Sequence, residues 1–136
     1  MKYQRTTGQL FDKNNVLLGT GWSGNGKGKN NPAMQTIPNV GPIPTGYYKI
    51  GTPYDSPNTG IFTLPLTPFS DNEMFGRSEF KMHGSAPNVD NDGFITGTKT
   101  PVSEGCIIMP HDVRQNVYNI SINEDINIID NEIQVI

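Results

Sequence analysis

Two short N-terminal segments with apolar positions are separated by a polar turn, which predicts a β-hairpin. Residues 9–11 and 16–20 carry the apolar side chains, and residues 12–15 read Asp-Lys-Asn-Asn. Asp and Asn tolerate the left-handed backbone that tight turns require. Residues 46–51 and 60–64 are aromatic and β-branched segments between turn residues, so they predict two further strands.

The segment from 79 to 83 alternates polar and apolar residues. On a strand, this alternation puts Phe80 and Met82 on one face and Glu79, Lys81 and His83 on the other. His83 is therefore expected at the end of a strand.

The C-terminal third predicts one short helix followed by closing strands. Residues 110–117 form a helix of about two turns, with Pro110 at an early position where its missing N–H has no cost. The expected strands after the helix span residues 118–122, 126–129 and 132–136, with a turn at 130–131.

Two long segments show neither the alternation of a strand nor the repeat of a helix, and they are rich in Gly, Asn and Pro. Residues 23–44 predict an ordered loop wrapped over the sheet, and residues 84–101 predict a second long connection. Because the second connection runs from a strand-end histidine to the only cysteine, the two loops predict a cleft.

Composition supports a mainly β chain. The 136 residues include 15 Gly and 11 Pro, and they are expected to form a single domain, 1–136, and a monomer.

A net charge of -3 with acidic and basic residues interspersed argues against nucleic acid as a partner. The chain carries neither a membrane-spanning apolar run nor an apolar leader segment. We therefore expect synthesis in the cytoplasm without a signal peptide, followed either by residence there or by export through a dedicated machine.

Cys106 is the only cysteine, so it cannot form an internal disulfide or hold a structural zinc by itself. Packing and reactivity both remain open for it. A reactive thiol needs a base, and His83, from a neighbouring strand, is better placed than His111 on the predicted helix. The carbonyl of Gly84 is a candidate for orienting that base. The N–H groups of Gly105 and Cys106 are candidates for an oxyanion hole.

Other motifs fail on inspection. Residues 21–28 match a phosphate-binding loop until Gly28, where a hydroxyl is required. Residues 88–93 resemble the start of a calcium loop, but Lys99 occupies the position of the terminal carboxylate. The sequon at 119–121 falls in a predicted strand. We therefore predict no cofactor and no metal.

Two blocks of sequence resemble a known family. The pair His83 and Gly84, followed by Ser-Glu-Gly-Cys-Ile at 103–107, resembles the His…Ser/Thr-His-Gly-Cys signature of the L,D-transpeptidases, the YkuD-like cysteine enzymes of bacterial cell walls. Residues 21–48 resemble the compact subgroup that type VI secretion systems deliver as antibacterial effectors. The resemblance covers roughly residues 8 to 122.

The resemblance implies a twisted β-sandwich with the cysteine in a groove, and an acyl-enzyme mechanism on peptidoglycan stem peptides. Cys106 matches the nucleophile, His83 the general base and Gly84 the residue whose carbonyl orients it. Ser103 matches the hydroxyl position, and Gly105 precedes the nucleophile. Attack on the L-centre of the diamino acid at stem position three would expel the terminal D-Ala, and water or an amine would complete the reaction.

The chain departs from the broad signature at two positions. Glu104 replaces the second histidine, and Ile108 stands where many relatives have arginine. These changes make cross-linking with a bulky acceptor strand doubtful. Trp22, Ser23 and Glu104 are assigned to substrate binding.

The leading hypothesis is thus a cysteine L,D-carboxypeptidase/L,D-transpeptidase that acts on the peptidoglycan of a competitor in the target-cell periplasm. Its expected partners are a stem peptide, a cognate immunity protein and a secretion-system carrier. Two alternatives stay open: a non-enzymatic peptidoglycan-binding module on the same scaffold, and a housekeeping or phage cell-wall enzyme.

Overall fold

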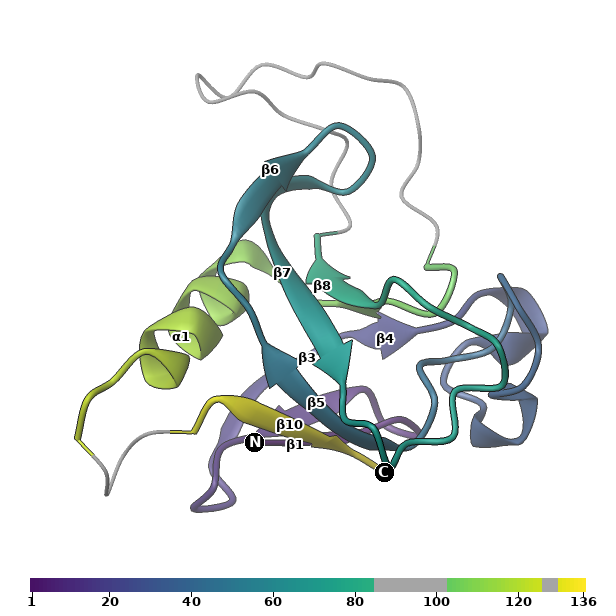
Figure 1. Cartoon of the computed structure of the whole chain (residues 1–136), viewed down its shortest axis with the longest axis horizontal. Coiled ribbons are helices and arrows are strands. Elements are labelled where there is room, and N and C mark those ends of the chain that lie inside the picture. The colour runs from purple at the N-terminus through teal and green to yellow at the C-terminus, as the bar shows by residue number, and fades with distance from the viewer. Residues whose placement is uncertain (85–102, 126–129) are drawn as a thin grey trace.

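The protein is mainly β, with one α-helix among the residues that the structure describes (Figure 1). The structure is a computed structural model, and it describes residues 1–84, 103–125 and 130–136. The helix, α1 (His111–Ser121), follows Cys106 as the sequence predicted. Two short 3-10 helices are η1 (Gly26–Gly28) and η2 (Pro32–Met34). The strands in these ranges are β1 (Lys2–Gln4), β2 (Gln9–Phe11), β3 (Leu17–Thr20), β4 (Trp22–Ser23), β5 (Gly46–Ile50), β6 (Tyr54–Ser56), β7 (Gly60–Pro68), β8 (Lys81–His83), β9 (Ile107–Ile108) and β10 (Glu132–Val135).

The strands follow the order β3-β2-β1-β10-β5-β7-β8-β9-β4, and β6 pairs with β7. The long strand β7 joins two halves of this sheet, because it pairs with β5 near its end and with β8 near its middle. The two outermost strands, β3 and β4, are consecutive in the chain and are separated only by Gly21. A chain that passes from one half of a sheet to the other at such a corner is consistent with a β-sandwich.

Gly21 is required at this corner because the backbone of β9 comes very close. A Cβ atom at this position would lie 1.7 Å from the carbonyl oxygen of Ile108. The corner therefore brings β4 against β9, directly beyond the cysteine.

A single cluster of buried apolar side chains fills the space between the sheet and α1. Helix α1 packs against β7, β3 and β8. It contributes Val113 and Val117, and Gly19 on β3 lies so close to Val113 that a Cβ there would be 2.6 Å from its Cγ2. The fully buried members of the cluster with the largest side chains are Tyr3, Tyr48, Leu10, Ile43, Leu64, Met82, Ile107, Met109 and Ile133.

The predicted strand at 118–122 is wrong, because the helix continues through Ser121. Val113, Val117 and Ser121 recur every four residues and form the buried face of the helix. This helical burial outweighs the β propensity of the segment's Tyr and Ile residues. The sequon at 119–121 therefore lies on a helix.

The other predicted elements agree with the structure where it describes them. The hairpin, the strands at 46–50 and 60–68, the strand-end position of His83 and the closing strand at 132–135 are confirmed. The segment 23–44 is an ordered loop that contains η1 and η2, and its glycines allow close packing: a Cβ on Gly28 would lie 2.0 Å from the carbonyl oxygen of Val40. The predicted strand at 126–129 and the calcium-like segment at 88–93 with Lys99 lie outside the described residues.

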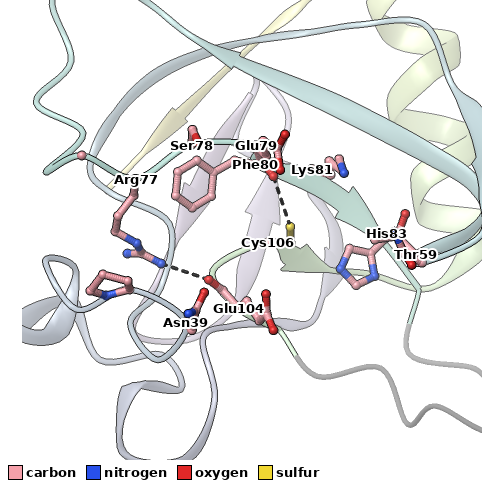
Figure 2. A pocket seen from close by; sticks show the side chains of 13 residues that line it. Asn39, Thr59, Arg77, Ser78, Glu79, Phe80, Lys81, His83, Glu104 and Cys106 are labelled. Carbon is pink, nitrogen blue, oxygen red and sulfur yellow. Dashed lines mark hydrogen bonds between the residues drawn. The ribbon is translucent and has the colours of Figure 1, made fainter.

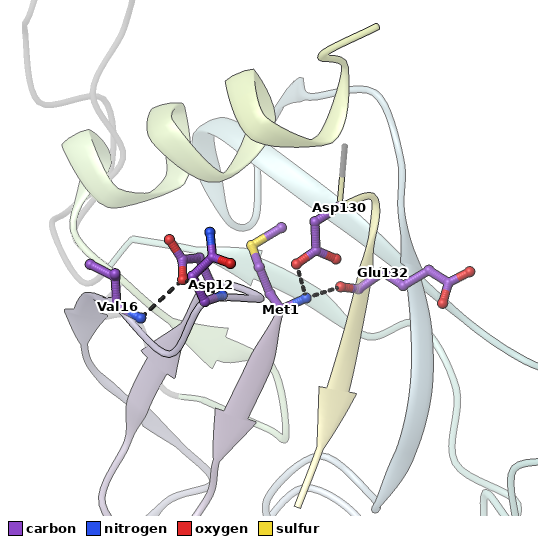
Figure 3. A network of polar contacts seen from close by, with 6 residues as sticks. Met1, Asp12, Val16, Asp130 and Glu132 are labelled. Carbon is purple, nitrogen blue, oxygen red and sulfur yellow. Dashed lines mark hydrogen bonds and ion pairs between the residues drawn. The ribbon is translucent and has the colours of Figure 1, made fainter. Parts of the chain in front are cut away.

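The N-terminal residues form a strand that the sequence analysis did not predict. β1 pairs in parallel with β10 and antiparallel with β2. The Met1 ammonium forms an ion pair with the Asp130 carboxylate and donates to the carbonyl oxygen of Glu132 at 2.7 Å (Figure 3). Beside it, Asp12 closes the hairpin turn by accepting the N–H of Val16 at 2.9 Å. These contacts join β1 to β10.

No helix in the described ranges is long and apolar enough to cross a membrane.

Candidate active site

A cleft of about 850 Å³ opens beside β8 and the turn that carries Cys106 (Figure 2). Its walls come from the 38–39 loop, the tip of the β6–β7 hairpin, the approach to β8 and the cysteine turn. The lining residues are Pro38, Asn39, Asn58, Thr59, Gly76, Arg77, Ser78, Glu79, Phe80, Lys81, His83, Glu104 and Cys106.

Neighbouring parallel strands bring Cys106 and His83 together. The register of β8 with β9 pairs Met82 with Ile107 and His83 with Ile108. Cys106 directly precedes β9, so continuing this register by one residue places it beside Lys81. Paired residues share a face of the sheet, and residues two apart on one strand share it too. Cys106 and His83 are therefore diagonal neighbours on the cleft side, a separation that long side chains can bridge.

His111 is not part of this cleft. Its ring is exposed and packs edge-on against Phe62, with the ring centroids 5.5 Å apart. His83 is largely buried, with 4% of its surface exposed, yet it lines the cleft. Of the two histidines, only His83 can act on a group bound beside Cys106.

A backbone carbonyl orients the His83 ring. Nδ1 of His83 lies 3.0 Å from the carbonyl oxygen of Gly84. Because a carbonyl only accepts hydrogen bonds, Nδ1 carries the proton, and the neutral ring has Nε2 as its basic nitrogen. The structure thus gives Gly84 the orienting contact that the sequence predicted.

Arg114 of α1 holds the backbone on both sides of this pair. Its guanidinium donates to the carbonyl oxygens of Met109 at 2.6 Å, Phe62 at 3.1 Å and Ile61 at 3.2 Å. A Cβ on Gly84 would lie 2.9 Å from Arg114 Nη1. A side chain at position 84 would therefore press on a guanidinium that three carbonyl oxygens hold in place.

Burial keeps both members of the pair uncharged near neutral pH. It lowers the pKa of His83 below the ordinary 6.5; the hydrogen bond to Gly84 opposes this, and the charges of Arg114 and Lys81 reinforce it. Burial also raises the pKa of Cys106 above the ordinary 9.0, although the Lys81 N–H and the Lys81 charge act in the opposite direction. The resting pair is a thiol beside a neutral imidazole.

Ser103 fixes the shape of the cysteine turn. Its buried Oγ accepts the N–H of Gly24 at 2.9 Å and of Gly105 at 3.3 Å, and it donates to the Cys106 carbonyl oxygen at 2.6 Å. The Gly105 N–H is thus engaged within the turn rather than directed at a substrate. The Cys106 N–H has no acceptor among the described residues and remains the candidate oxyanion donor.

Ser103→Ala is expected to destabilise the fold by about 2–4 kcal/mol, because it leaves two buried N–H groups and one carbonyl without their partner. Urea unfolding followed by circular dichroism measures the change. Ser70→Ala, at an exposed serine, is the matched control and should leave the midpoint unchanged. Equal midpoints for the two variants would mean that Ser103 does not hold the turn.

The structure does not support substrate contacts for two of the three predicted binding residues. Ser23 is fully buried, donates to the carbonyl oxygen of Gly105 at 2.9 Å and accepts the N–H of Ile43 at 2.8 Å. Trp22 does not line the cleft, and its ring instead contacts the ammonium of Lys29, 4.7 Å from the ring centroid. Ser23 supports the cysteine turn through Gly105, and Trp22 pairs with Ile108 on β9. Glu104 alone of the three lines the cleft.

Arg77 is a site residue that the sequence analysis missed. Its guanidinium is buried over the Phe80 ring and donates to four carbonyl oxygens. It also occupies the space beside Gly105: a Cβ there would lie 2.3 Å from Arg77 Nη2, and the φ of Gly105 is +125°. No spacing in the sequence marks this arginine, because its partners are all backbone groups. The acceptors are Gln35 at 2.6 Å, Pro42 at 2.7 Å, Gly41 at 2.9 Å and Glu104 at 3.1 Å.

Within the described residues, no three His, Cys, Asp or Glu side chains are grouped closely enough to hold a metal ion.

The chain was compared with protein families, with curated proteins and with solved structures. No curated protein and no solved structure matches the chain. The family model described as the Tlde1 domain matches residues 19–129, which include the loop behind the cysteine turn, both cleft strands and α1. The chain therefore belongs to the Tlde1 domain family, a family of type VI secretion effectors that target peptidoglycan.

Proposed function

We propose that the protein is a cysteine L,D-carboxypeptidase/L,D-transpeptidase that cleaves peptidoglycan stem tetrapeptides through an acyl-enzyme on Cys106. One observation carries the proposal: Cys106, directly before β9, and His83, on the paired strand β8, line one cleft, and the carbonyl oxygen of Gly84 accepts the Nδ1–H of His83. A nucleophile, a base and an orienting group are the elements that covalent acyl transfer requires.

The first half-reaction begins from the neutral pair. As Cys106 Sγ bonds to the carbonyl carbon of the L-centre at stem position three, Nε2 of His83 takes the thiol proton. The Cys106 N–H donates to the developing oxyanion. The C–N bond to D-Ala then breaks, and His83 returns the proton to the departing amine, leaving a thioester and a neutral imidazole.

The second half-reaction restores the enzyme. Water, or the amine of a D-amino acid, attacks the thioester carbonyl while His83 takes its proton. The C–S bond breaks, and the sulfur regains a proton from His83. Water yields the tripeptide, and the amine yields an exchanged tetrapeptide. Concerted proton transfer suits a thiol whose pKa is raised, because a preformed thiolate is scarce near neutral pH.

We further propose that the protein is exported by a type VI secretion system and acts in the periplasm of the target cell. Membership of the Tlde1 domain family supports this biological setting. A cell that makes such a toxin needs protection from it, so a cognate immunity protein is the expected partner.

Incubating the purified protein with a disaccharide tetrapeptide tests the activity directly. We expect conversion to the tripeptide with release of free D-Ala, and incorporation of a labelled D-amino acid when one is supplied. Mass spectrometry of rapidly quenched protein should show one stem peptide added to Cys106. Protein blocked at its single thiol with iodoacetamide is the control. Binding of the muropeptide without turnover, identical before and after blocking, would instead support a non-enzymatic binding module.

A housekeeping or phage enzyme would perform the same chemistry in the producing cell. Expression directed to the periplasm of a sensitive bacterium separates these roles. An effector should lyse or deform the cells only when exported, and a neighbouring gene should restore growth.

A further inference from the structure

We propose that Lys81 is the residue that recognises the free carboxylate of the amino acid expelled or accepted by the enzyme. The inference rests on the proposed function and adds a specificity residue to it. Its ligand is a single amino acid with a free α-carboxylate, bound on the leaving-group side of Cys106.

The strand register places Lys81 beside the reacting atoms. It stands two residues before His83 on the same face of β8, and it directly precedes Met82, whose partner Ile107 directly follows Cys106. Figure 2 shows Lys81 and His83 on this strand, Glu79 on the segment that leads to it, and the Cys106 sulfur on the neighbouring turn. Lys81 lines the same cleft as Cys106 and His83, and its charge lowers the pKa of both groups. An ammonium at this position is therefore part of the site.

The other charged residues of the cleft are not suited to bind a carboxylate. Arg77 is buried, with 8% of its surface exposed, and its terminal nitrogens are engaged by four carbonyl oxygens. Glu79 and Glu104 are carboxylates, which repel a substrate carboxylate. Within the described residues Lys81 forms no ion pair, so its ammonium remains available for a ligand. Among the described cleft residues it is thus the cation positioned to bind an anion.

The chemistry of the proposed reaction supplies such an anion. In a tetrapeptide, the carboxylate of the terminal D-Ala is separated from the scissile nitrogen by one carbon. A cation close to the nucleophile can bind it while the thiol attacks, which selects a bond with only one residue beyond it. A free D-amino acid that enters for exchange carries the same group in the same place. One lysine would therefore favour removal or replacement of a single terminal residue.

Two substrates that differ only at this carboxylate test the proposal. Wild-type protein should cleave the tetrapeptide acid with a kcat/KM about 10- to 100-fold above that of its C-terminal amide, mainly through KM. Lys81→Met should lower kcat/KM for the acid by a similar factor and leave the amide nearly unchanged. Lys81→Arg should keep most of the preference, because it retains the charge. Lys49→Met, at an exposed lysine of β5 outside the cleft, is the matched control.

The ratio of kcat/KM for the acid to kcat/KM for the amide separates recognition of the carboxylate from other effects of Lys81. Loss of its charge also changes the electrostatics of the thiol and imidazole, but those changes affect both substrates equally. If Lys81→Met retains the wild-type ratio, or if wild type shows no preference, the proposal is overturned while the proposed function stands. If wild type cleaves neither substrate, both are overturned.

Discussion

Cys106→Ala is expected to abolish conversion of tetrapeptide to tripeptide, lowering kcat/KM by about 10⁴-fold or more. The variant removes the atom that becomes acylated, and no other described residue of the cleft offers a thiol. The loss should occur without unfolding, because the hydrogen bonds of the sulfur are weak: it lies 3.9 Å from the carbonyl oxygen of Glu79, and its other backbone partner is the Lys81 N–H. Product formation by chromatography and the unfolding midpoint in urea measure the two effects.

Cys106→Ser is the matched control for shape. Serine keeps a donor of similar size but is a far weaker nucleophile, so it should fold like wild type and show little turnover. Because the chain has one cysteine, the mass added by iodoacetamide reports on this residue alone. Turnover by the alanine variant within tenfold of wild type would rule out the acyl-enzyme.

His83→Gln is expected to lower kcat/KM by about 10²- to 10⁴-fold. Glutamine retains an N–H group for a hydrogen bond, but it cannot take the thiol proton. His111→Gln changes the other histidine, which is exposed and outside the cleft, and should have wild-type activity. The reverse result, with His111 essential and His83 dispensable, would contradict the assignment of the base.

The same pair of variants tests the pH dependence. Neutral His83 is the active form, so kcat/KM should fall as the pH falls through the pKa of His83. Burial lowers that pKa, which places the acid limb below 6.5. His83→Gln should lose this limb, and His111→Gln should keep it. Rates across the acidic range, with tetrapeptide well below KM, measure the profile.

Local patterns predicted the parts of the fold in which one face of a strand is buried. The alternation at 79–83 placed Phe80 and Met82 in the core, and it left Lys81 and His83 for the cleft face. The same logic failed at 118–122, because packing of a helical face overrode β propensity. The short strand β1 was missed because its partners lie at both ends of the chain.

The sequence likewise indicated some residues of the candidate site and missed or misassigned others. The sequence motif linked Cys106 with His83, and the structure has both residues in the lining of one cleft. The motif could not identify Arg77. This side chain donates four hydrogen bonds to backbone carbonyl oxygens, and every residue type has such an oxygen, so no sequence pattern marks its partners. The motif also could not separate contact with substrate from support, so Ser23 was assigned to binding although it is buried behind the turn.

The parallel pairing of β8 with β9 has an evolutionary consequence. Parallel neighbours cannot be joined by a tight turn, so a connection of a dozen or more residues has to run between the base and the nucleophile. The strand register sets how the side chains of His83 and Cys106 are aligned. Changes of sequence between Gly84 and Ser103 should therefore be tolerated without moving Cys106 relative to His83.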